Sequence, residues 1–295
     1  MNNVSPGAIC YHRGQAWRKS FSSLSQTPTE TALCGDEKWR RVMIQLHDKH
    51  VVVIGGSRGL GAASAVMAAK AGAQVSITYR SDAEAAEKVI QQIGSSGGEA
   101  FAIQAEVSHQ KDMENAMAQA VEKFGPPHGL VVSAGIFEGP ARIEEMSLEF
   151  WSRTMVINVT GTFLAVKAAV KHIRQAHIPA SIVIYTSTAG QRGSEDYSAY
   201  ATSKGAQILF MRSMARELGP ERIRVNCIAP AWTETDMARP SLDAIGRDKL
   251  KKKFVLRKIG HPDDIAGATV YLLSDLANHV TGITLTVDGG MDMRG

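Results

Sequence analysis

A glycine cluster between an apolar run and an alanine-rich segment is the feature that most constrains the fold of this chain. Residues 51–54 read Val-Val-Val-Ile, and Gly55, Gly59 and Gly61 follow before the segment 62–71. A short, wholly apolar run suits a strand that is buried on both faces of a parallel sheet. Glycines between such a strand and a helix let the backbone approach a pyrophosphate, which the helix N-terminus also favours. This segment therefore predicts a dinucleotide-binding unit.

Strand and helix patterns alternate from this unit to the C-terminus. Strands are predicted at residues 51–54, 74–79, 99–105, 130–132, 182–185, 223–228 and 283–287. Helices are predicted at residues 62–71, 81–93, 111–124, 148–175, 197–218 and 263–273, and residues 231–260 read as irregular with helical pieces. This alternation predicts an α/β fold with a single doubly wound parallel sheet of Rossmann type, seven strands flanked by helices. We find no internal repeat and no second domain.

The composition excludes several classes of protein. The chain has 295 residues, 44% hydrophobic and 21% charged, which fits a globular protein with a sizeable core. The net charge is +4, of which residues 1–42 contribute +3, so the body is nearly neutral and nothing predicts a nucleic-acid partner. No apolar run approaches the roughly 20 residues of a membrane span. Three cysteines, Cys10, Cys34 and Cys227, make no disulfide framework, and we predict a cytoplasmic protein without a metal site.

Residues 1–42 differ from the rest of the chain. They are rich in Ser, Thr, Gly and Pro and show no sustained period, so we predict a disordered extension ahead of a folded domain over residues 43–295. Two alternatives stay open. The basic residues Arg13, Arg18 and Lys19 among serines also fit an organelle transit peptide, and Met43 is a candidate start of the protein.

The end of the second predicted strand bears on the choice of cofactor. NAD sites place an acid there to bind the ribose 2′-hydroxyl. Here Tyr79 and Arg80 take those positions, and the first acid, Asp82, fits the N-cap of the next helix. Arg80 and Arg58 suit a 2′-phosphate through charge-assisted hydrogen bonds. We therefore predict NADP(H) in preference to NAD(H), which remains possible.

Tyr200 and Lys204 form the candidate proton-transfer pair. On a helix these residues lie one turn apart on the same face. A neighbouring ammonium group favours the phenolate and lowers the pKa of a tyrosine toward working pH. Such a tyrosine gives a proton to a carbonyl oxygen or takes one from an alcohol. Alone this spacing is a weak signal, because most such pairs lie on the protein surface.

Further motifs resemble the short-chain dehydrogenase/reductase family, in its branch of about 250 residues, across residues 43–295. The glycine cluster looks like that branch's T-G-x-x-x-G-x-G with Ile54 at the Thr position, and Tyr200 to Lys204 looks like its Y-x-x-x-K. Ser187 precedes Tyr200 by thirteen residues, and Asn158 falls at the position of the family's fourth catalytic residue. The runs 226–230 and 288–290 resemble the family's N-x-x-x-P and its C-terminal signature.

The resemblance implies an oxidoreductase that interconverts a carbonyl and a secondary alcohol, a ketoreductase. Asn158, Ser187, Tyr200 and Lys204 are the implied catalytic residues: Tyr200 transfers the proton, Ser187 stabilises the developing oxyanion, and Asn158 fixes a water in a proton relay behind Lys204. The predicted cofactor-binding residues are Gly55, Ser57, Arg58, Gly59, Leu60, Gly61, Tyr79, Arg80, Glu106, Val107, Ala134, Gly135, Tyr200, Lys204, Pro230, Thr233 and Thr235. The chain departs from the family's N-N-A-G at Ser133, from its usual Asp at Glu106 and from its Pro-Gly at Ala231.

Two alternative functions remain at this point. Tyr197 lies seven residues before Lys204, the Y-x6-K spacing of divergent enoyl reductases, and two helical turns bring it to nearly the same face. A non-catalytic cofactor-binding scaffold is the other alternative. The partner is a small carbonyl or alcohol, with no membrane partner, and the resemblance implies a homo-oligomer, dimer or tetramer, through the helices at 148–175 and 197–218.

The substrate surface is expected from residues 136–145, 190–196 and 231–260. Phe137, Trp151 and Trp232 are candidate apolar walls. Arg192 and the lysine-rich run 249–253 suggest a weaker idea, an anionic or carrier-linked substrate. The loop sequences do not identify the substrate.

Overall fold

The computed structural model describes residues 44–293, and these residues belong to one compact unit. The predicted extension over residues 1–42 lies outside the described residues, as does the alternative start Met43. Among the described helices, none combines the length and the apolarity needed to cross a lipid bilayer.

A parallel sheet is the framework of the domain. Within the described residues, seven strands lie in the order β3-β2-β1-β4-β5-β6-β7, and each pair of neighbours is parallel. The strands are β1 (His50–Ile54), β2 (Gln74–Tyr79), β3 (Ala100–Gln104), β4 (Gly129–Val132), β5 (Ala180–Tyr185), β6 (Ile223–Pro230) and β7 (Thr284–Val287). The order reverses between β1 and β4, and ligands of such sheets bind outside the carboxyl ends of the strands at this switch point. The predicted doubly wound parallel α/β sheet is confirmed.

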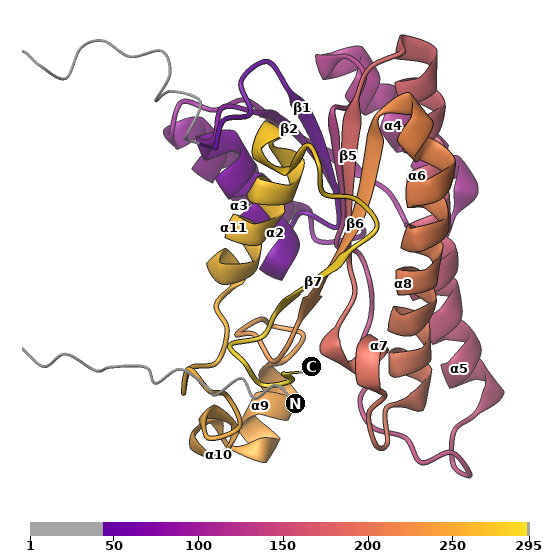
Figure 1. Cartoon of the computed structure of the whole chain (residues 1–295), viewed down its shortest axis with the longest axis vertical. Coiled ribbons are helices and arrows are strands. Elements are labelled where there is room, and N and C mark those ends of the chain that lie inside the picture. The colour runs from indigo at the N-terminus through magenta and orange to yellow at the C-terminus, as the bar shows by residue number, and fades with distance from the viewer. Residues whose placement is uncertain (1–43, 294–295) are drawn as a thin grey trace, which may run out of the picture. The chain divides into compact units, whose positions relative to one another are not determined.

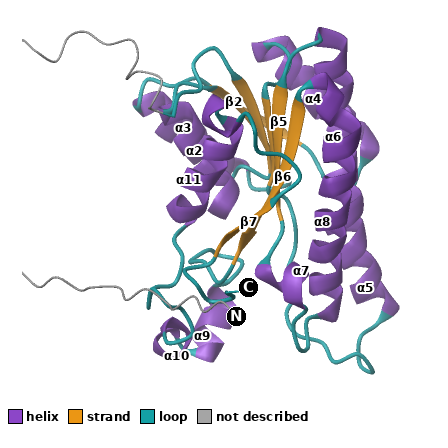
Figure 2. Cartoon of the chain, viewed as in Figure 1, coloured by secondary structure: helices purple, strands orange, loops and turns teal. Residues whose placement is uncertain are grey.

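Helices cover both faces of the sheet (Figure 1). α2, α3 and α11 lie on one face, and α4, α5, α6 and α8 lie on the other. Figure 2 shows the same three layers by type of secondary structure. The helices are α2 (Gly59–Lys70), α3 (Ala83–Ser95), α4 (Gln110–Phe124), α5 (Leu148–Met155), the π-helical turn η2 (Val156–Thr160), α6 (Gly161–Ala176), α7 (Thr188–Arg192), α8 (Ser198–Leu218), α9 (Arg239–Ile245), α10 (Arg247–Lys251) and α11 (Pro262–Leu273), with short 3₁₀ turns η3 (Gly219–Glu221) and η4 (Asp275–Ala277).

The central strands are buried on both faces because each face of the sheet packs against an apolar core. Val52 and Ile54 of β1 belong to the apolar core beneath α4, α6 and α8. Val51 and Val53 belong to the opposite core, beneath α2, α3 and α11. Successive side chains of a strand point to opposite faces, so an unbroken apolar run is what this position requires.

Residues 231–260 form a smaller apolar cluster of their own. Leu242, Leu250, Phe254 and Ile259 are buried together, and partly buried side chains from neighbouring loops pack on them. The cluster lies beside β7, whose four residues are only half-buried. This part of the domain therefore packs separately from the two cores that flank the sheet.

The predicted single helix over residues 148–175 is wrong in one detail. The structure divides it into α5 and α6 with the π-helical turn η2 between them, centred on Asn158. The backbone carbonyl of Asn158 accepts hydrogen bonds from the Thr162 hydroxyl (2.7 Å) and the Gln207 carboxamide (2.8 Å). Side chains that bond to a backbone carbonyl compete with the regular helical ladder, and single π turns occur frequently at functional sites.

Candidate functional site

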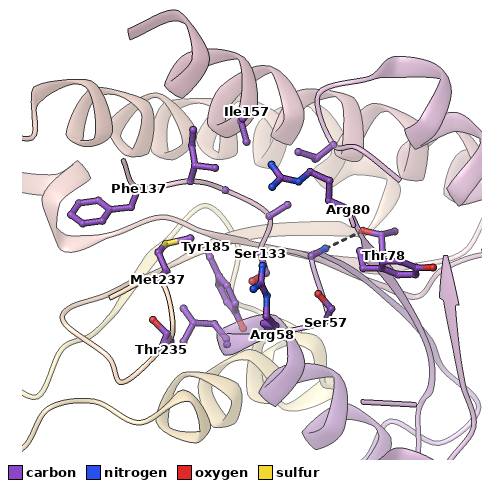
Figure 3. A pocket seen from close by; sticks show the side chains of 18 of the residues that line it. Ser57, Arg58, Thr78, Arg80, Ser133, Phe137, Ile157, Tyr185, Thr235 and Met237 are labelled. Carbon is purple, nitrogen blue, oxygen red and sulfur yellow. Dashed lines mark hydrogen bonds between the residues drawn. The ribbon is translucent and has the colours of Figure 1, made fainter. Parts of the chain in front are cut away.

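Two adjoining cavities lie at the carboxyl ends of the strands. The larger has a volume of about 540 Å³ and is bordered by the loops after β1, β2, β3 and β4 (Figure 3). The smaller, about 160 Å³, lies between the loops after β5 and β6. The residues that border both cavities are Leu60, Phe137, Thr186, Tyr200, Thr235 and Met237. A ligand in one cavity therefore meets a ligand in the other at the side chain of Tyr200.

The glycine loop shapes the floor of the larger cavity by close approach of backbones. The amide of Gly55 donates to Thr78 Oγ1 at 3.0 Å, the dashed bond in Figure 3. A Cβ added at Gly55 would lie 2.8 Å from the backbone of Ala134, and one added at Gly61 would lie 2.1 Å from the Gly55 carbonyl oxygen. Gly61 itself borders neither cavity, so its place is in packing α2 against β1.

The N-terminus of α2 faces the same cavity with free amides. Its N-cap residue, Arg58, has an extended backbone and makes no capping hydrogen bond with its side chain among the described residues. The first turn contains no acidic residue. Uncapped amides and the helix dipole together make an anion site, which suits a pyrophosphate.

Two arginines, each opposite an acid, border the far end of the larger cavity. Arg58 Nη1 lies 3.9 Å from Asp82 Oδ2, and Arg80 Nε lies 3.9 Å from Glu106 Oε2. Figure 3 shows both arginine side chains extending into the cavity. Asp82 caps α3 as predicted, since its carboxylate accepts from the Ala85 amide at 2.9 Å. The side chains of Arg58 and Arg80 are 60% and 59% exposed, so their acids leave them available to a ligand.

Tyr200, which borders both cavities, meets Ser187, which borders the smaller one. Tyr200 lies in the first turn of α8, and Ser187 is the N-cap of α7, where its hydroxyl accepts from the Ala189 amide at 3.2 Å. Burial raises the pKa of Tyr200 to about 12, although a hydrogen bond with Ser187 favours the ionised form. The phenol is therefore protonated at neutral pH, as a proton donor must be.

Lys204 lies one turn further along α8 and is buried. Its ammonium donates to the backbone carbonyl of Tyr185 at 2.8 Å and lies 5.7 Å from the centre of the Tyr200 ring. Burial lowers the pKa of Lys204 to about 8. The prediction that Lys204 lowers the pKa of Tyr200 is wrong for this geometry, because desolvation dominates and the ammonium is directed to the β5 carbonyl.

Asn158 lies behind these groups and joins two elements. Its Oδ1 accepts from the amide of Ile136 at 2.8 Å, and its Nδ2 donates to the Ile136 carbonyl at 3.1 Å and to Ser203 Oγ at 3.0 Å. The side chain is fully buried and borders neither cavity. It therefore fixes the loop after β4 to α8, beside Lys204.

Most of the predicted cofactor residues come together in the larger cavity. Those that border it are Gly55, Ser57, Arg58, Gly59, Leu60, Tyr79, Arg80, Glu106, Val107, Ala134, Gly135, Tyr200, Lys204 and Thr235. Pro230 and Thr233 border the smaller cavity instead. The sequence did not single out Thr78, Ile157 or Met237, which also border the larger cavity, as does Ser133, noted only as a departure from the family motif. The only sequence signal for them was that they lie next to predicted cofactor residues in the chain. Strand and helix patterns do not show which loop residues come together at a cavity.

The predicted substrate residues separate into two groups. Phe137, Trp232 and Arg192 border the smaller cavity, whereas Trp151 on α5 and the lysine-rich run 249–253 border neither. The guanidinium of Arg192 is paired with the carboxylate of Asp292 at 2.7 Å. The pairing weakens the idea that Arg192 receives an anionic substrate.

Known proteins resemble the chain over most of its length. A family model described as Enoyl-(Acyl carrier protein) reductase matches residues 54–292. Glucose 1-dehydrogenase 2 from Bacillus subtilis (strain 168) is 34% identical over 248 residues, which cover 84% of this chain and 96% of that protein. L-rhamnose 1-dehydrogenase (NAD(P)(+)) from Azotobacter vinelandii is 34% identical over 250 residues, 83% of this chain and 97% of that protein.

Solved structures agree with the sequence relatives. The crystal structure of a dehydrogenase/reductase from Sinorhizobium meliloti 1021 is 34% identical and superposes with a TM-score of 0.78. The match covers 85% of this chain and 97% of that one. The likeness therefore extends over the sheet and its helices.

Proposed function

The chain belongs to the short-chain dehydrogenase/reductase family, and from this premise we propose that it is an NADP(H)-dependent enzyme that interconverts a carbonyl and a secondary alcohol with Tyr200 as general acid and base. Its membership makes it an oxidoreductase that acts on CH–OH donors with an NAD(P) cofactor. One observation carries the finer proposal. Tyr200 borders both cavities and hydrogen-bonds to Ser187, so a cofactor and a carbonyl oxygen both reach the same phenol.

The residues around the larger cavity fit a dinucleotide. Because Gly55 has no side chain, its backbone packs against that of Ala134 and a cofactor can approach the loop closely. The uncapped amides of α2 suit the pyrophosphate. Lys204 and Thr235 border the end of this cavity nearest Tyr200. When bound, the nicotinamide ring supplies or accepts the hydride.

The protein's own groups handle the proton and the developing charge. In the direction of carbonyl reduction, the neutral phenol of Tyr200 donates its proton to the carbonyl oxygen. Ser187 donates a hydrogen bond to the same oxygen as negative charge develops on it. Lys204, cationic below a pH of about 8, adds positive charge on the protein side of the phenol.

The preference for NADP(H) rests on Arg58 and Arg80. Both guanidinium groups border the larger cavity, more than half exposed, where a 2′-phosphate offers them two further negative charges. Their acids, Asp82 and Glu106, moderate the preference without removing it. Comparison of kcat/KM for NADPH and NADH tests this part, and an equal or higher value for NADH contradicts it.

Enoyl reduction through Tyr197 is the second candidate, favoured by the description of the matching family model. Tyr197 stacks on Phe137 with ring centres 5.2 Å apart and borders the smaller cavity only. Tyr200, in contrast, borders both cavities, and of the two tyrosines it is the one that hydrogen-bonds to Ser187. The geometry therefore supports carbonyl reduction better, with Tyr197 as a wall of the pocket.

An α,β-unsaturated ketone separates the two candidates in one experiment, because it offers both bonds to the same enzyme. We expect 4-phenyl-3-buten-2-one and NADPH to give the allylic alcohol, identified by gas chromatography. The Tyr197→Phe variant should give the same product. The saturated ketone as main product would establish enoyl reduction. No turnover of this or any simple ketone, with NADPH still bound, would favour the non-catalytic scaffold.

Exposed apolar side chains on α5, η2, α6 and α8 support a homo-oligomer. Leu148 and Leu209 are 79% and 64% exposed, and Val156 and Phe163 are each 45% exposed. A stripe of this kind on neighbouring helices suits an interface with a second copy of the chain. Sedimentation of the wild type and of Leu209→Glu tests this. We expect a dimer or tetramer that the charged residue weakens, and a monomeric wild type would contradict the proposal.

A further inference from the structure

The smaller cavity has a chemical character that narrows the class of substrate. Its walls include the aromatic rings of Phe137, Tyr197 and Trp232 and the thioethers of Met237 and Met291. We propose that the substrate is a small carbonyl compound, or the corresponding secondary alcohol, that carries an apolar ring, and that sugars and other polyols are excluded. This inference rests on the proposed function, because it places the reacting oxygen at Tyr200.

The aromatic wall is already assembled around Tyr200. Phe137 lies at its centre, stacked on Tyr197 at 5.2 Å and edge-to-face with Tyr200 at 5.0 Å and with Trp232 at 6.2 Å. Aromatic pairs favour both arrangements, so these rings stabilise one another without a ligand. A ring of the substrate adds one more member to a preformed group, and little side-chain entropy is lost on binding.

Two of the hydroxyl groups that border the cavity are occupied within the protein. The hydroxyl of Thr186 donates to the Lys204 carbonyl at 2.7 Å, and that of Thr233 donates to the Ala231 carbonyl at 3.1 Å. Among the described residues that border this cavity, none is Asp, Glu, Asn or Gln. A polyol that enters must give up its hydrogen bonds to water, and the cavity offers no carboxylate or carboxamide group in exchange. The relative named glucose 1-dehydrogenase 2 is therefore a poor guide to this chain's substrate.

The volume of the cavity agrees with one ring. Its volume is about 160 Å³. An engineered apolar cavity of about 150 Å³ in another protein binds benzene. A phenyl or cyclohexyl group therefore fits beside Tyr200.

The C-terminal turn fixes one wall of the cavity. The carboxylate of Asp288 accepts from the amides of Gly290 (2.9 Å) and Asp292 (2.8 Å), and Gly290 takes a positive φ of 76°. The ion pair of Asp292 with Arg192 joins this turn to α7. Together these bonds place Met291 in the wall of the smaller cavity and pair Arg192, which also borders this cavity, with a carboxylate.

Two of the wall residues pack on the separate cluster of residues 231–260. Trp232 and Met291 both contact the group formed by Leu242, Leu250, Phe254 and Ile259. Substitutions at Trp232 and Met291 therefore alter the smaller cavity while the sheet and the larger cavity keep their packing. The structure also offers a matched control, since Met293 lies two residues further along the same turn and is 78% exposed.

Oxidation of two alcohols with NADP+ tests the inference in one direction of the reaction. In the oxidation of 1-phenylethanol, Tyr200 first releases its phenolic proton to solvent and then takes the hydroxyl proton as the carbinol carbon transfers a hydride to NADP+. The products are acetophenone, NADPH and one released proton. We expect kcat/KM for 1-phenylethanol to exceed that for glucose and for rhamnose at least 100-fold. Equal or faster oxidation of either sugar overturns the inference while the proposed function stands. Oxidation of none of the three, together with no reduction of the unsaturated ketone, overturns both.

Binding without turnover provides the second readout. Acetophenone and NADP+ form a complex that cannot react, so titration calorimetry of the NADP+-bound protein measures the affinity of the ring alone. We expect Trp232→Ala and Met291→Ala to raise the Kd of acetophenone at least fivefold, with the Kd of NADP+ unchanged. Met293→Ala should bind acetophenone like the wild type. An unchanged Kd in both cavity variants, each with a wild-type melting curve, overturns the inference.

Discussion

The two cavities that meet at Tyr200 are supported by different parts of the molecule. The larger rests on the central sheet, where the glycine loop packs against β4 and the first turn of α2. The smaller rests on loops, the separate apolar cluster of residues 231–260 and the C-terminal turn. A change in the first support should therefore affect the stability of the whole domain. A change in the second should affect only which compound reacts.

Ser187 borders the smaller cavity beside Tyr200 and, after Tyr200 itself, should show the largest effect. Ser187→Ala removes a hydrogen-bond donor to the developing oxyanion, which costs about 10²–10³ in kcat for such groups. We expect this loss in the NADPH-dependent reduction of ketones, with the Kd of NADPH unchanged. Ser213→Ala, an exposed serine on α8, is the control. A loss of less than tenfold would remove Ser187 from the chemistry and leave it only as the cap of α7.

Gly61→Ala should disrupt the packing of α2 against the glycine loop beneath the larger cavity and lower the stability of the domain. The added Cβ would lie 2.1 Å from the Gly55 carbonyl oxygen, so the helix must move away from the strand. Overpacking of this kind costs about 1–3 kcal/mol, and we expect that decrease in the free energy of unfolding measured with urea.

Gly94→Ala is the matched control for that variant. Gly94 lies in α3 with no atom within 4 Å of an added Cβ, so alanine there should stabilise the protein by about 0.5–1 kcal/mol. Equal stability of Gly61→Ala and the wild type would show that the close contact is not required.

Lys204→Met tests whether the buried charge of Lys204, beside Tyr200, lowers the free energy of unfolding. The pKa of Lys204 falls from 10.5 to about 8 on folding. Below pH 8 both states carry the proton, and the buried charge destabilises the folded protein by at most about 3 kcal/mol. Between pH 8 and 10.5 the folded state releases its proton first, so this cost declines. We expect the variant to exceed the wild type in stability at pH 7 by more than at pH 10, although the Tyr185 carbonyl loses its donor.

Urea denaturation at the two pH values provides the measurement for Lys204→Met. The comparison between pH values cancels the pH-independent loss of the bond to Tyr185. A stability difference that is the same at pH 7 and pH 10 would contradict a lowered pKa for Lys204.

The smallest effect is expected at the arginines of the larger cavity, which are largely exposed. Arg80→Ala should lower kcat/KM for NADPH about tenfold and leave the value for NADH nearly unchanged, because one charge-assisted hydrogen bond is lost. Glu106→Gln should act in the opposite direction, about twofold, by releasing Arg80 from its partner at 3.9 Å. Equal losses for both cofactors in Arg80→Ala would show that this residue does not read the 2′-phosphate.

The sequence predicted best those parts of the fold in which burial dictates the type of residue. Each predicted strand overlaps the observed one, since a run such as 51–54, buried on both faces, has to be wholly apolar. The glycine loop was likewise readable, because only glycine permits the contact of Gly55 with Ala134. Both features depend on residues that are near one another in the chain or follow a simple period.

What the sequence left open depends on contacts between distant segments. The π-helical turn at Asn158 coincides with hydrogen bonds to the Ile136 amide and from the Gln207 carboxamide, and no local sequence pattern predicts these contacts. The pKa of Tyr200 is dominated by burial, which spacing from Lys204 does not measure. Met291 enters the wall of the smaller cavity only because the C-terminal turn folds back on residues 231–260.

A single-turnover experiment on Tyr200→Phe tests the central claim most directly. The protein, saturated with NADPH, is mixed rapidly with a ketone substrate, and the loss of nicotinamide absorbance is followed while cofactor affinity is measured separately by fluorescence. General acid catalysis contributes about 10²–10⁴-fold, so we expect hydride transfer to be slowed by at least 100-fold with the Kd of NADPH unchanged within twofold. Hydride transfer within tenfold of the wild-type rate would show that Tyr200 is not the proton donor at the junction of the two cavities.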